Sequence, residues 1–191
     1  KNAAKNNLKT LLVDEKNELG GATIYQNREF NKIDDQNSSD WLKKEILELK
    51  KIKNLEIKTR TSVAAFHGYN YLLARENLTD HLEKNEKQEK VRQRLLKIRA
   101  KKVILATGAL ERPLVFNNND RPGIMLSSAV KKYADFYGVA SGKKNVFFTN
   151  NDSAYESAFC LHSKGIKVEA IIDIRESSNS KIVKAVEEAG I

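Results

Sequence analysis

The segment that most constrains the fold spans residues 101–113, where an apolar run ends in small residues. Residues 103–105 (Val-Ile-Leu) are all apolar, which is typical of a strand buried on both faces of a parallel sheet. The run ends at Ala106-Thr107-Gly108, and small residues let the backbone approach a ligand closely. Open α/β sheets bind cofactors at the carboxyl ends of their strands. The sequence therefore predicts an α/β fold with a ligand site beside Thr107 and Gly108.

Strand and helix patterns alternate on both sides of this segment, which indicates two Rossmann-like halves with a central parallel sheet. The predicted strands span 8–13, 55–57, 145–149 and 168–172. Residues 2–7 are typical of the tail of a helix, and further helices are predicted from the N-cap Asp40 onward, over 127–137, from Asp152 or Ser153 to 165, and over 180–190. The pieces 62–66, 69–77 and 91–99 indicate an antiparallel meander, turned at 67–68 and 83–90.

These elements predict a domain plan. We expect residues 1–116 to form a first dinucleotide-binding domain, with the meander at about 61–100, followed by a crossover at 117–140. Residues 141–191 are expected to begin a second Rossmann-like domain. The chain contains no Gly-x-Gly-x-x-Gly, the loop that holds a pyrophosphate at a helix N-terminus. We therefore expect the first domain to lack its first strand and glycine loop, and the chain to be truncated at both ends.

Acidic residues after the strand at 8–13 are the first candidates for cofactor binding. An acid at the end of the second strand of a Rossmann fold accepts hydrogen bonds from an adenosine ribose, and Glu15 occupies that position. Gly20 and Gly21 follow, and they suit a cofactor that lies over the backbone. Asp14 is the rival acid, one residue away. Alternatively, Glu15 caps a helix from a surface loop.

The second half lacks the chemistry of a phosphate loop. After the strand at 145–149, the loop position is occupied by residues 149–154 (Thr-Asn-Asn-Asp-Ser-Ala), whose side chains crowd the approach of a pyrophosphate. Asp152 would also repel phosphate. We therefore do not expect a second dinucleotide here, although Asp173 and Arg175 stand where contacts to a ribose or a 2′-phosphate would form.

Nothing in the sequence indicates a catalytic nucleophile or a metal site. Cys160 is the only cysteine, which excludes a Cys-x-x-Cys centre, and its apolar neighbours predict a core thiol. The three histidines are far apart and lack metal-ligand spacing. Glu111 and Arg112 are expected either to contact the cofactor or to pair with each other. The single cysteine and the lack of any run long enough to span a bilayer predict a cytoplasmic protein.

The net charge of +9 raises the question of a nucleic-acid partner. The lysines are interleaved with Asp and Glu along the chain, and no zinc-finger, helix-turn-helix or RNP pattern accompanies them. The composition therefore predicts a solvated Lys-rich surface, with neither nucleic acid nor membrane as a partner.

Several segments together resemble the α subunits of heterotetrameric sarcosine oxidases, and the Ala-Thr-Gly turn also resembles the signature of two-dinucleotide flavoproteins. The matching segments are Leu-Leu-Val-Asp-Glu with Leu-Gly-Gly (11–15 and 19–21), Ala-Thr-Gly-Ala-Leu-Glu-Arg-Pro-Leu-Val-Phe (106–116), Asn-Asp-Arg-Pro-Gly-Ile-Met-Leu (119–126), Tyr-Gly-Val (137–139), Val-Phe-Phe-Thr-Asn-Asn-Asp-Ser-Ala-Tyr (146–155) and Asp-Ile-Arg (173–175). The resemblance implies a Rossmann-like FAD/NAD(P)-binding fold over nearly the whole chain.

The resemblance also implies a function. Such complexes demethylate sarcosine oxidatively to glycine, release hydrogen peroxide and pass the one-carbon unit to tetrahydrofolate. It implies NAD, or FAD, in the first dinucleotide site of this chain, contacted by Glu15, Gly20, Gly21, Thr107 and Gly108. FAD would lie on a partner subunit that performs the amine chemistry, and FMN between subunits.

Two other functions remain open. One is an NAD(P)H-dependent flavoprotein reductase similar to thioredoxin reductase, against which the missing Cys-x-x-Cys and the missing second glycine loop argue. The other is a non-catalytic scaffold subunit that keeps the nucleotide fold for its subunit contacts.

Overall fold

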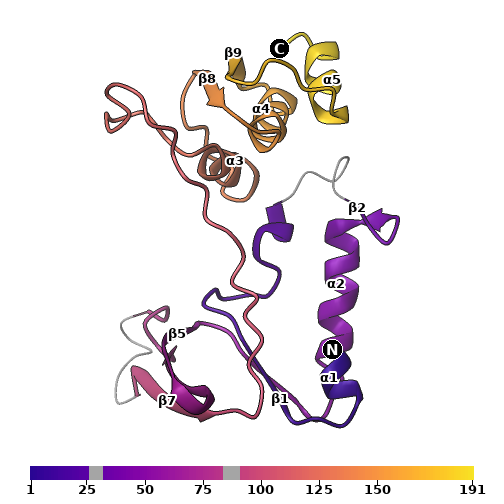
Figure 1. Ribbon diagram of the computed structural model, residues 1–191, viewed down its shortest axis with the longest axis vertical. Helices are drawn as coiled ribbons and strands as arrows, with labels where there is room; N and C mark the ends of the chain where they lie inside the picture. The colour runs from indigo at the N-terminus through magenta and orange to yellow at the C-terminus, as the bar shows by residue number, and fades with distance from the viewer. Residues whose placement is uncertain (26–31, 84–90) are drawn as a thin grey trace. The chain divides into compact units, whose positions relative to one another are not determined.

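The computed structural model describes residues 1–25, 32–83 and 91–191, and the chain forms two compact units. The first unit comprises Lys1–Gly21 and Asp40–Gly108, and the second comprises Ala22–Ser39 and Ala109–Ile191. Figure 1 follows the chain through both. Parallel strand pairs joined by helices occur in each unit, as the sequence predicts for an α/β fold.

In the first unit, a short parallel pair is formed by β1 (Thr10–Val13) and β4 (Leu55–Lys58). Their register runs from Thr10 opposite Leu55 to Val13 opposite Lys58. Parallel neighbours require a crossover, and α2 (Ser38–Leu49) lies between them in the chain. A single helical turn, α1 (Asn2–Lys5), precedes β1. Both predicted strands and the short N-terminal helix are therefore confirmed, with shifted ends.

The predicted start of α2 is wrong by one turn. The helix begins at Ser38, and Asp40 lies in its first turn, where an acid suits the positive end of the helix dipole. The Asn37 side chain caps the helix instead, because its Oδ1 accepts hydrogen bonds from the backbone N and the Oγ of Ser39 at 3.0 and 2.9 Å.

The predicted meander is confirmed as a three-stranded antiparallel sheet, in the order β5 (Thr61–His67), β6 (Tyr71–Asn77) and β7 (Gln93–Arg99). A short 3₁₀ turn, η2 (Gly68–Asn70), joins β5 to β6, and Tyr69 and Asn70 have φ values of 59° and 54° there. The second predicted turn, at 83–90, falls outside the described residues apart from Glu83.

An ion pair joins the parallel pair of the first unit to its meander. Lys58 Nζ at the end of β4 donates to Glu76 Oε1 on β6 at 3.0 Å, and the two side chains are 18% and 12% exposed. The Glu76 hydrogen bond raises the pKa of Lys58. Glu76 Oε2 accepts no hydrogen bond within the described residues, although Arg94 Nη1 lies 3.5 Å away. Lys58 is therefore the main partner of a mostly buried carboxylate.

Replacing Lys58 with alanine is expected to lower the free energy of unfolding of the first unit by about 1–3 kcal/mol, because it leaves a mostly buried charge without its hydrogen-bond donor. Urea unfolding followed by circular dichroism measures this. Lys97 on β7 is exposed, so Lys97→Ala is the matched control. Adding Glu76→Leu to Lys58→Met should restore much of the lost stability. If the double variant is no more stable than Lys58→Met alone, the pair does not act as described.

The predicted strand at 103–105 is not formed. Residues 102–110 have no regular secondary structure, and Ile104 and Leu105 are 86% and 67% exposed. A strand requires a neighbour for its backbone hydrogen bonds. In the described part of the chain, no hydrogen bond joins this segment to β1 or β4, which pair only with each other. The apolar run therefore lies in an extended connection.

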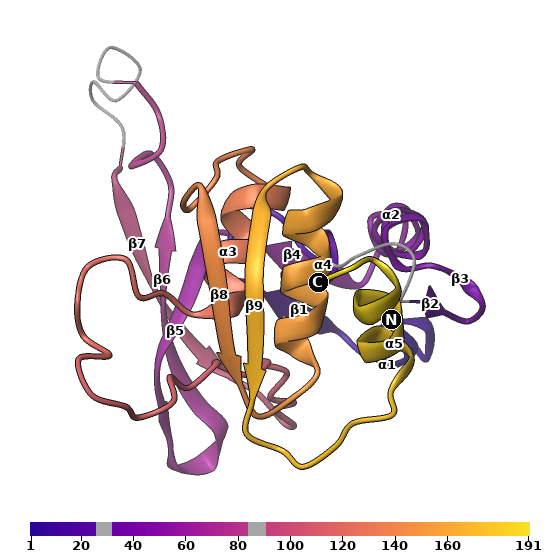
Figure 2. The ribbon, with the colours of Figure 1, turned by 90° about the horizontal axis from the view of Figure 1, so that it is seen from above.

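The second unit is built on a parallel pair, β8 (Lys144–Thr149) and β9 (Lys167–Asp173), joined by α4 (Ser153–Ser163). Figure 2 shows α4 running along the pair. Two further helices, α3 (Ser127–Asp135) and α5 (Lys181–Glu188), pack against α4. All five elements agree with the predicted ones to within a few residues. The C-terminal helix begins after Ser180, whose Oγ accepts from Val183 N at 3.4 Å.

A small hairpin in the second unit has no counterpart among the predictions. It follows the 3₁₀ turn η1 (Gly21–Tyr25), and it pairs β2 (Lys32–Ile33) with β3 (Gln36–Asn37) in antiparallel fashion. Asp34 and Asp35 form its turn with φ values of 49° and 58°. Positive φ at both central residues is the geometry of a type I′ hairpin.

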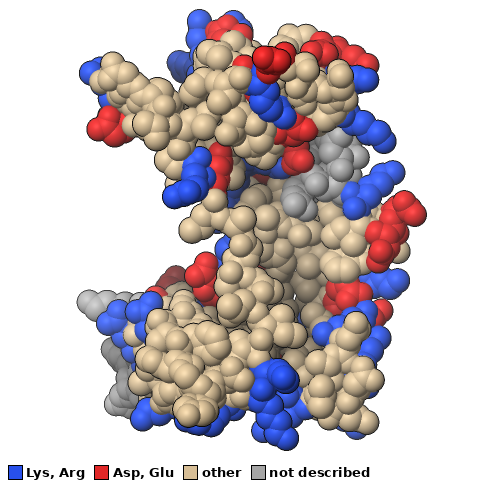
Figure 3. Space-filling view, viewed as in Figure 1, with Lys and Arg blue, Asp and Glu red and all other residues tan. Residues whose placement is uncertain are grey.

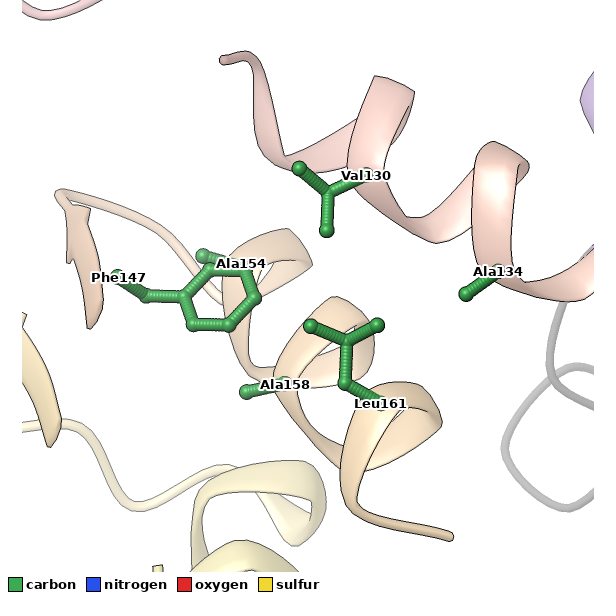
Figure 4. Packing of buried hydrophobic residues seen from close by; sticks show 6 residues of the cluster. All are labelled: Val130, Ala134, Phe147, Ala154, Ala158 and Leu161. Carbon is green, nitrogen blue, oxygen red and sulfur yellow. The ribbon is translucent and has the colours of Figure 1, made fainter. Parts of the chain in front are cut away.

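The core of the second unit lies between its helices and the inner face of its strands. Figure 4 shows its buried residues, which come from α3, β8 and α4: Val130, Ala134, Phe147, Ala154, Ala158 and Leu161. Ile166, Val168 and Ile171 pack against this cluster. Cys160 is also buried, and burial raises the pKa of its thiol, as expected for a core cysteine.

Charged side chains of both signs are scattered over the visible face of each unit. In Figure 3, Lys and Arg side chains are spread over this face with Asp and Glu among them. Among the described residues, none of the helices has the length and apolar character needed to cross a bilayer.

Candidate nucleotide site

The loop after β1 carries the two rival acids, and the structure gives them different roles. Asp14 is fixed in place by its backbone, which donates to Lys58 O and accepts from Thr61 N at 2.9 Å each. Its side-chain Oδ1 accepts from Lys16 N at 2.9 Å. The Asp14 carboxylate therefore shapes the turn that leaves β1.

Glu15 is the acid of this loop whose carboxylate has no partner among the described residues at the end of β1. It is exposed, and it makes no hydrogen bond or ion pair with any other residue that the structure describes. A carboxylate of this kind, at the end of a parallel strand, has acceptor sites for both hydroxyls of a ribose. Of the two acids, Glu15 is therefore the one available to a ligand.

Two glycines follow this loop in conformations that other residues rarely adopt. Gly20 and Gly21 have φ values of 128° and 56°. No atom lies within 4 Å of where a Cβ would sit on Gly21, so glycine is favoured here by the positive φ of the backbone and not by crowding of a side chain. The space beside it suits the close approach of a ligand. Contact of Glu15, Gly20 and Gly21 with the adenosine end of a dinucleotide stays a prediction, and the sequence of this chain contains no glycine loop for the pyrophosphate.

Thr107 and Gly108 belong to the same unit as Glu15 and both glycines. Both are exposed, and Gly108 has a φ of 73° with open space around it. No hydrogen bond connects either residue to the loop after β1 within the described part of the chain. Contact of Thr107 and Gly108 with the ligand of Glu15 therefore stays a prediction.

Glu111 serves a helix and does not pair with Arg112. Its Oε1 accepts from the backbone N and the Oγ of Ser127 at 3.1 and 2.8 Å, and its Oε2 accepts from Ser128 N at 2.8 Å. A carboxylate at a helix N-terminus accepts hydrogen bonds from free N–H groups, and its negative charge interacts favourably with the positive end of the helix dipole. Burial alone would raise the pKa of Glu111, but the hydrogen bonds from Ser128 and Ser127 outweigh it and lower the pKa. Glu111 is thus the cap of α3.

Replacing Glu111 with alanine is expected to destabilise the second unit by about 1 kcal/mol at neutral pH, the usual cost of a lost cap. Because folding lowers the pKa of Glu111, its contribution is present above the unfolded value of about 4.3 and is lost as the pH falls through the folded value. Urea unfolding at pH 7 and below pH 4 measures both effects. Glu176→Ala, at an exposed position in the same unit, is the control. A loss that is the same at both pH values would contradict the capping role.

The candidates of the second half engage each other. Asp173 and Arg175 form an ion pair, with Arg175 Nη2 2.6 Å from Asp173 Oδ2. Asp152, one of the two predicted caps with Ser153, is the N-cap residue of α4, but its side chain makes no capping hydrogen bond. Its carboxylate contacts Arg175 instead, and Asn151 Oδ1 accepts from Ser153 N at 3.0 Å. Tyr155 joins this network through Asp173. The one sequence signal for this role of Tyr155 is its position three residues after Asp152, which places the two side chains one helical turn apart.

The structure brings no metal-binding cluster together: within the described residues, no group of three or more His, Cys, Asp or Glu side chains can hold an ion.

Comparisons with known proteins identify relatives of this chain. No family model matches it. It is 39% identical over 184 residues to the sarcosine oxidase subunit alpha of Corynebacterium sp. strain P-1 and 38% identical to that of strain U-96, in each case over 96% of this chain and 19% of the relative. It is 35% identical over 176 residues to the same subunit of Rhizobium meliloti strain 1021, over 92% of this chain and 17% of the relative. The chain thus spans about a fifth of their length.

A solved structure has a similar fold. The crystal structure of L-proline dehydrogenase from P. horikoshii matches with a TM-score of 0.67 and 24% identity, over 93% of this chain and 33% of that one. The match confirms the predicted α/β fold. The sequence relatives confirm the predicted resemblance to an oxidase subunit.

Proposed function

This chain is a relative of one segment of sarcosine oxidase α subunits, and we propose on that premise that it is the dinucleotide-binding part of such a subunit. The observation that supports this best is the exposed Glu15 carboxylate after β1, which has no partner among the described residues and is followed in the chain by two glycines with positive φ. Glu15 holds the adenosine ribose, while Gly20 and Gly21 let the ligand lie on the backbone. Thr107 and Gly108 complete the contacts.

A dinucleotide bound here, NAD or FAD, supplies the capacity to accept a hydride. The residues of this chain bind and orient it, and none of them acts on an amine. The chemistry, oxidative demethylation of sarcosine to glycine with release of hydrogen peroxide, takes place on a partner subunit that carries FAD. FMN lies between subunits, and tetrahydrofolate accepts the one-carbon unit.

The activity is tested on the full-length protein purified with its partner subunits. Sarcosine should drive peroxide release, measured by a peroxidase-coupled assay, and denaturation should release NAD, FAD and FMN, measured by mass spectrometry. Release of FAD alone, together with NADH oxidation that needs no amine, would point to a flavoprotein reductase instead. Release of no nucleotide at all would favour a scaffold subunit.

The binding site is tested by Glu15→Gln in the full-length protein. Loss of a hydrogen bond to a charged acceptor costs about 1.5–3 kcal/mol, so the dissociation constant for the nucleotide should rise about 10-fold to 100-fold. Equilibrium dialysis of the apoprotein measures it. Glu18 is an exposed acid of the same loop region, and Glu18→Gln should leave the affinity unchanged. Equal affinities in the Glu15→Gln and wild-type proteins would refute the assignment of Glu15.

A further inference from the structure

The second unit contains the framework of another nucleotide site. In parallel α/β folds, phosphates bind at the N-terminus of the crossover helix, and the ribose binds an acid at the end of the next strand. In the second unit these positions are the loop from Thr149 at the end of β8 to Ser153 at the start of α4, and Asp173 at the end of β9. The two-dinucleotide fold therefore implies a second ligand here, and the residues present decide whether it fits.

The helix N-terminus is already occupied by its own loop. Asn151 Oδ1 accepts from both Ser153 N at 3.0 Å and Ser153 Oγ at 2.6 Å. Thr149 Oγ1 accepts from Asn151 N at 3.1 Å and donates to Asn151 O at 3.0 Å, which closes the loop on itself. The first N–H of α4, which a phosphate would use, is thus engaged by a side chain.

The acid at the end of β9 is saturated with donors. Asp173 Oδ1 accepts from Arg175 N at 3.0 Å and from Arg175 Nε at 3.1 Å. Asp173 Oδ2 accepts from Arg175 Nε at 3.1 Å, from Arg175 Nη2 at 2.6 Å and from the Tyr155 hydroxyl at 3.0 Å. A carboxylate offers about four lone-pair sites. Asp173 therefore has no acceptor left for a ribose hydroxyl.

Arg175 also connects the two loops of this framework. Its Nη2 lies 2.8 Å from Asp152 Oδ1, on the loop that would receive the phosphates, and Ser178 Oγ donates to the same oxygen at 3.2 Å. The negative charge of the Asp152 carboxylate thus takes the place of a phosphate charge, and Arg175 balances it within the chain.

We propose that Asp152, Arg175, Asp173 and Tyr155 fill the second nucleotide position with an internal ion network, so that the second unit binds no dinucleotide. Arg175 in this role is a structural counter-ion and not a ligand for a 2′-phosphate. The unit keeps the framework of a nucleotide site and uses it to tie the β8–α4 loop to the β9–α5 loop. The proposal does not depend on the first site.

Hydrogen exchange of the full-length protein tests this, with NAD⁺, NADP⁺, FAD and ADP each added in excess. Exchange of the amides at 149–156 and 173–178 should be unchanged by every ligand. Slower exchange of these amides with any ligand would overturn the proposal. The amides at 13–21 report on the first site separately: protection there supports Glu15, and its absence counts against the proposed function alone.

Nucleotide binding by two variants provides an independent test of the proposal. If Arg175 bound a ligand, Arg175→Ala would weaken nucleotide binding at least tenfold or remove one nucleotide per chain. We expect the nucleotide content and dissociation constant to stay within twofold of the wild-type values. Tyr155→Phe removes one hydroxyl from the network and should likewise leave binding unchanged. A tenfold loss of affinity in the folded Tyr155→Phe protein would overturn the proposal even if Arg175→Ala fails to fold.

Discussion

Replacing Leu161 with alanine should lower the free energy of unfolding of the second unit by about 2–5 kcal/mol. Leu161 has an exposed fraction of 0% and belongs to the cluster that joins α3, β8 and α4. Its truncation removes apolar contact and leaves a cavity between elements that cannot close in fully, because Val130 and Phe147 are held by their own helix and strand. This loss is a large share of the stability of a small domain.

The measurement is urea unfolding of the full chain, with hydrogen exchange to assign the loss to the second unit. Leu47→Ala is the matched control, because it makes the same chemical change on α2 at a side chain that is 60% exposed. It should cost less than about 0.5 kcal/mol. A cost of Leu161→Ala that equals that of the control would mean that the described core is not the one that stabilises this unit.

The elements that the sequence predicts correctly are those whose pattern is local and repeated. The helices α2, α3 and α4 and the strands of the meander show their period over several residues, and periodicity indicates type even where the ends are off by a few residues. The hairpin of β2 and β3 has two residues in each strand, too few for any period to show. Its Asp34-Asp35 turn also lacks the glycine that usually marks a type I′ hairpin.

The wrong predictions share a cause, which is that each depends on a partner remote in sequence or on a choice among equivalent neighbours. Residues 103–105 have the composition of a buried strand, but a strand forms only where another strand offers a ladder. The sequence predicts caps at Asp40 and at Asp152 or Ser153, but the side chains that accept the first helical N–H groups are those of Asn37 and Asn151, which have the same capping chemistry.

The residues of the candidate sites also divide into those indicated by a local sequence pattern and those whose role depends on a remote partner. Glu15, Gly20 and Gly21 are identifiable from sequence because strand, acid and glycines are adjacent in the chain. The acid that remains free can only be told from the structure, since the Asp14 side chain is engaged by Lys16 N. Glu111 acts on a helix that begins sixteen residues later, a separation that no local pattern reveals.

The second large effect is expected from Arg175→Ala, which should lower the free energy of unfolding of the second unit at pH 7. This network is partly exposed, so the loss should be smaller than for a fully buried ion pair. The variant leaves the Asp152 and Asp173 carboxylates without their shared cation, each still charged at neutral pH. Mutual repulsion adds to the lost hydrogen bonds.

Lowering the pH should remove this difference in stability between wild type and Arg175→Ala, because the pKa values of both carboxyl groups are lowered by folding. The Arg175 side chain lowers the pKa of Asp173 to about 2. Burial alone would raise the pKa of Asp152, but hydrogen bonds, foremost that from Arg175, lower it. Because both folded pKa values lie below the unfolded one of about 3.9, the stabilisation is complete above that pH and is lost as the pH falls toward 2.

Urea unfolding at pH 7, 5, 3.5 and 2.5 should show the free energies of unfolding of wild type and Arg175→Ala converging as the pH falls. Arg112→Ala, at an exposed arginine of the same unit, is the control and should follow the wild type throughout. A gap between wild type and Arg175→Ala that is as wide at pH 2.5 as at pH 7 would show that Arg175 stabilises the unit by packing and not by charge.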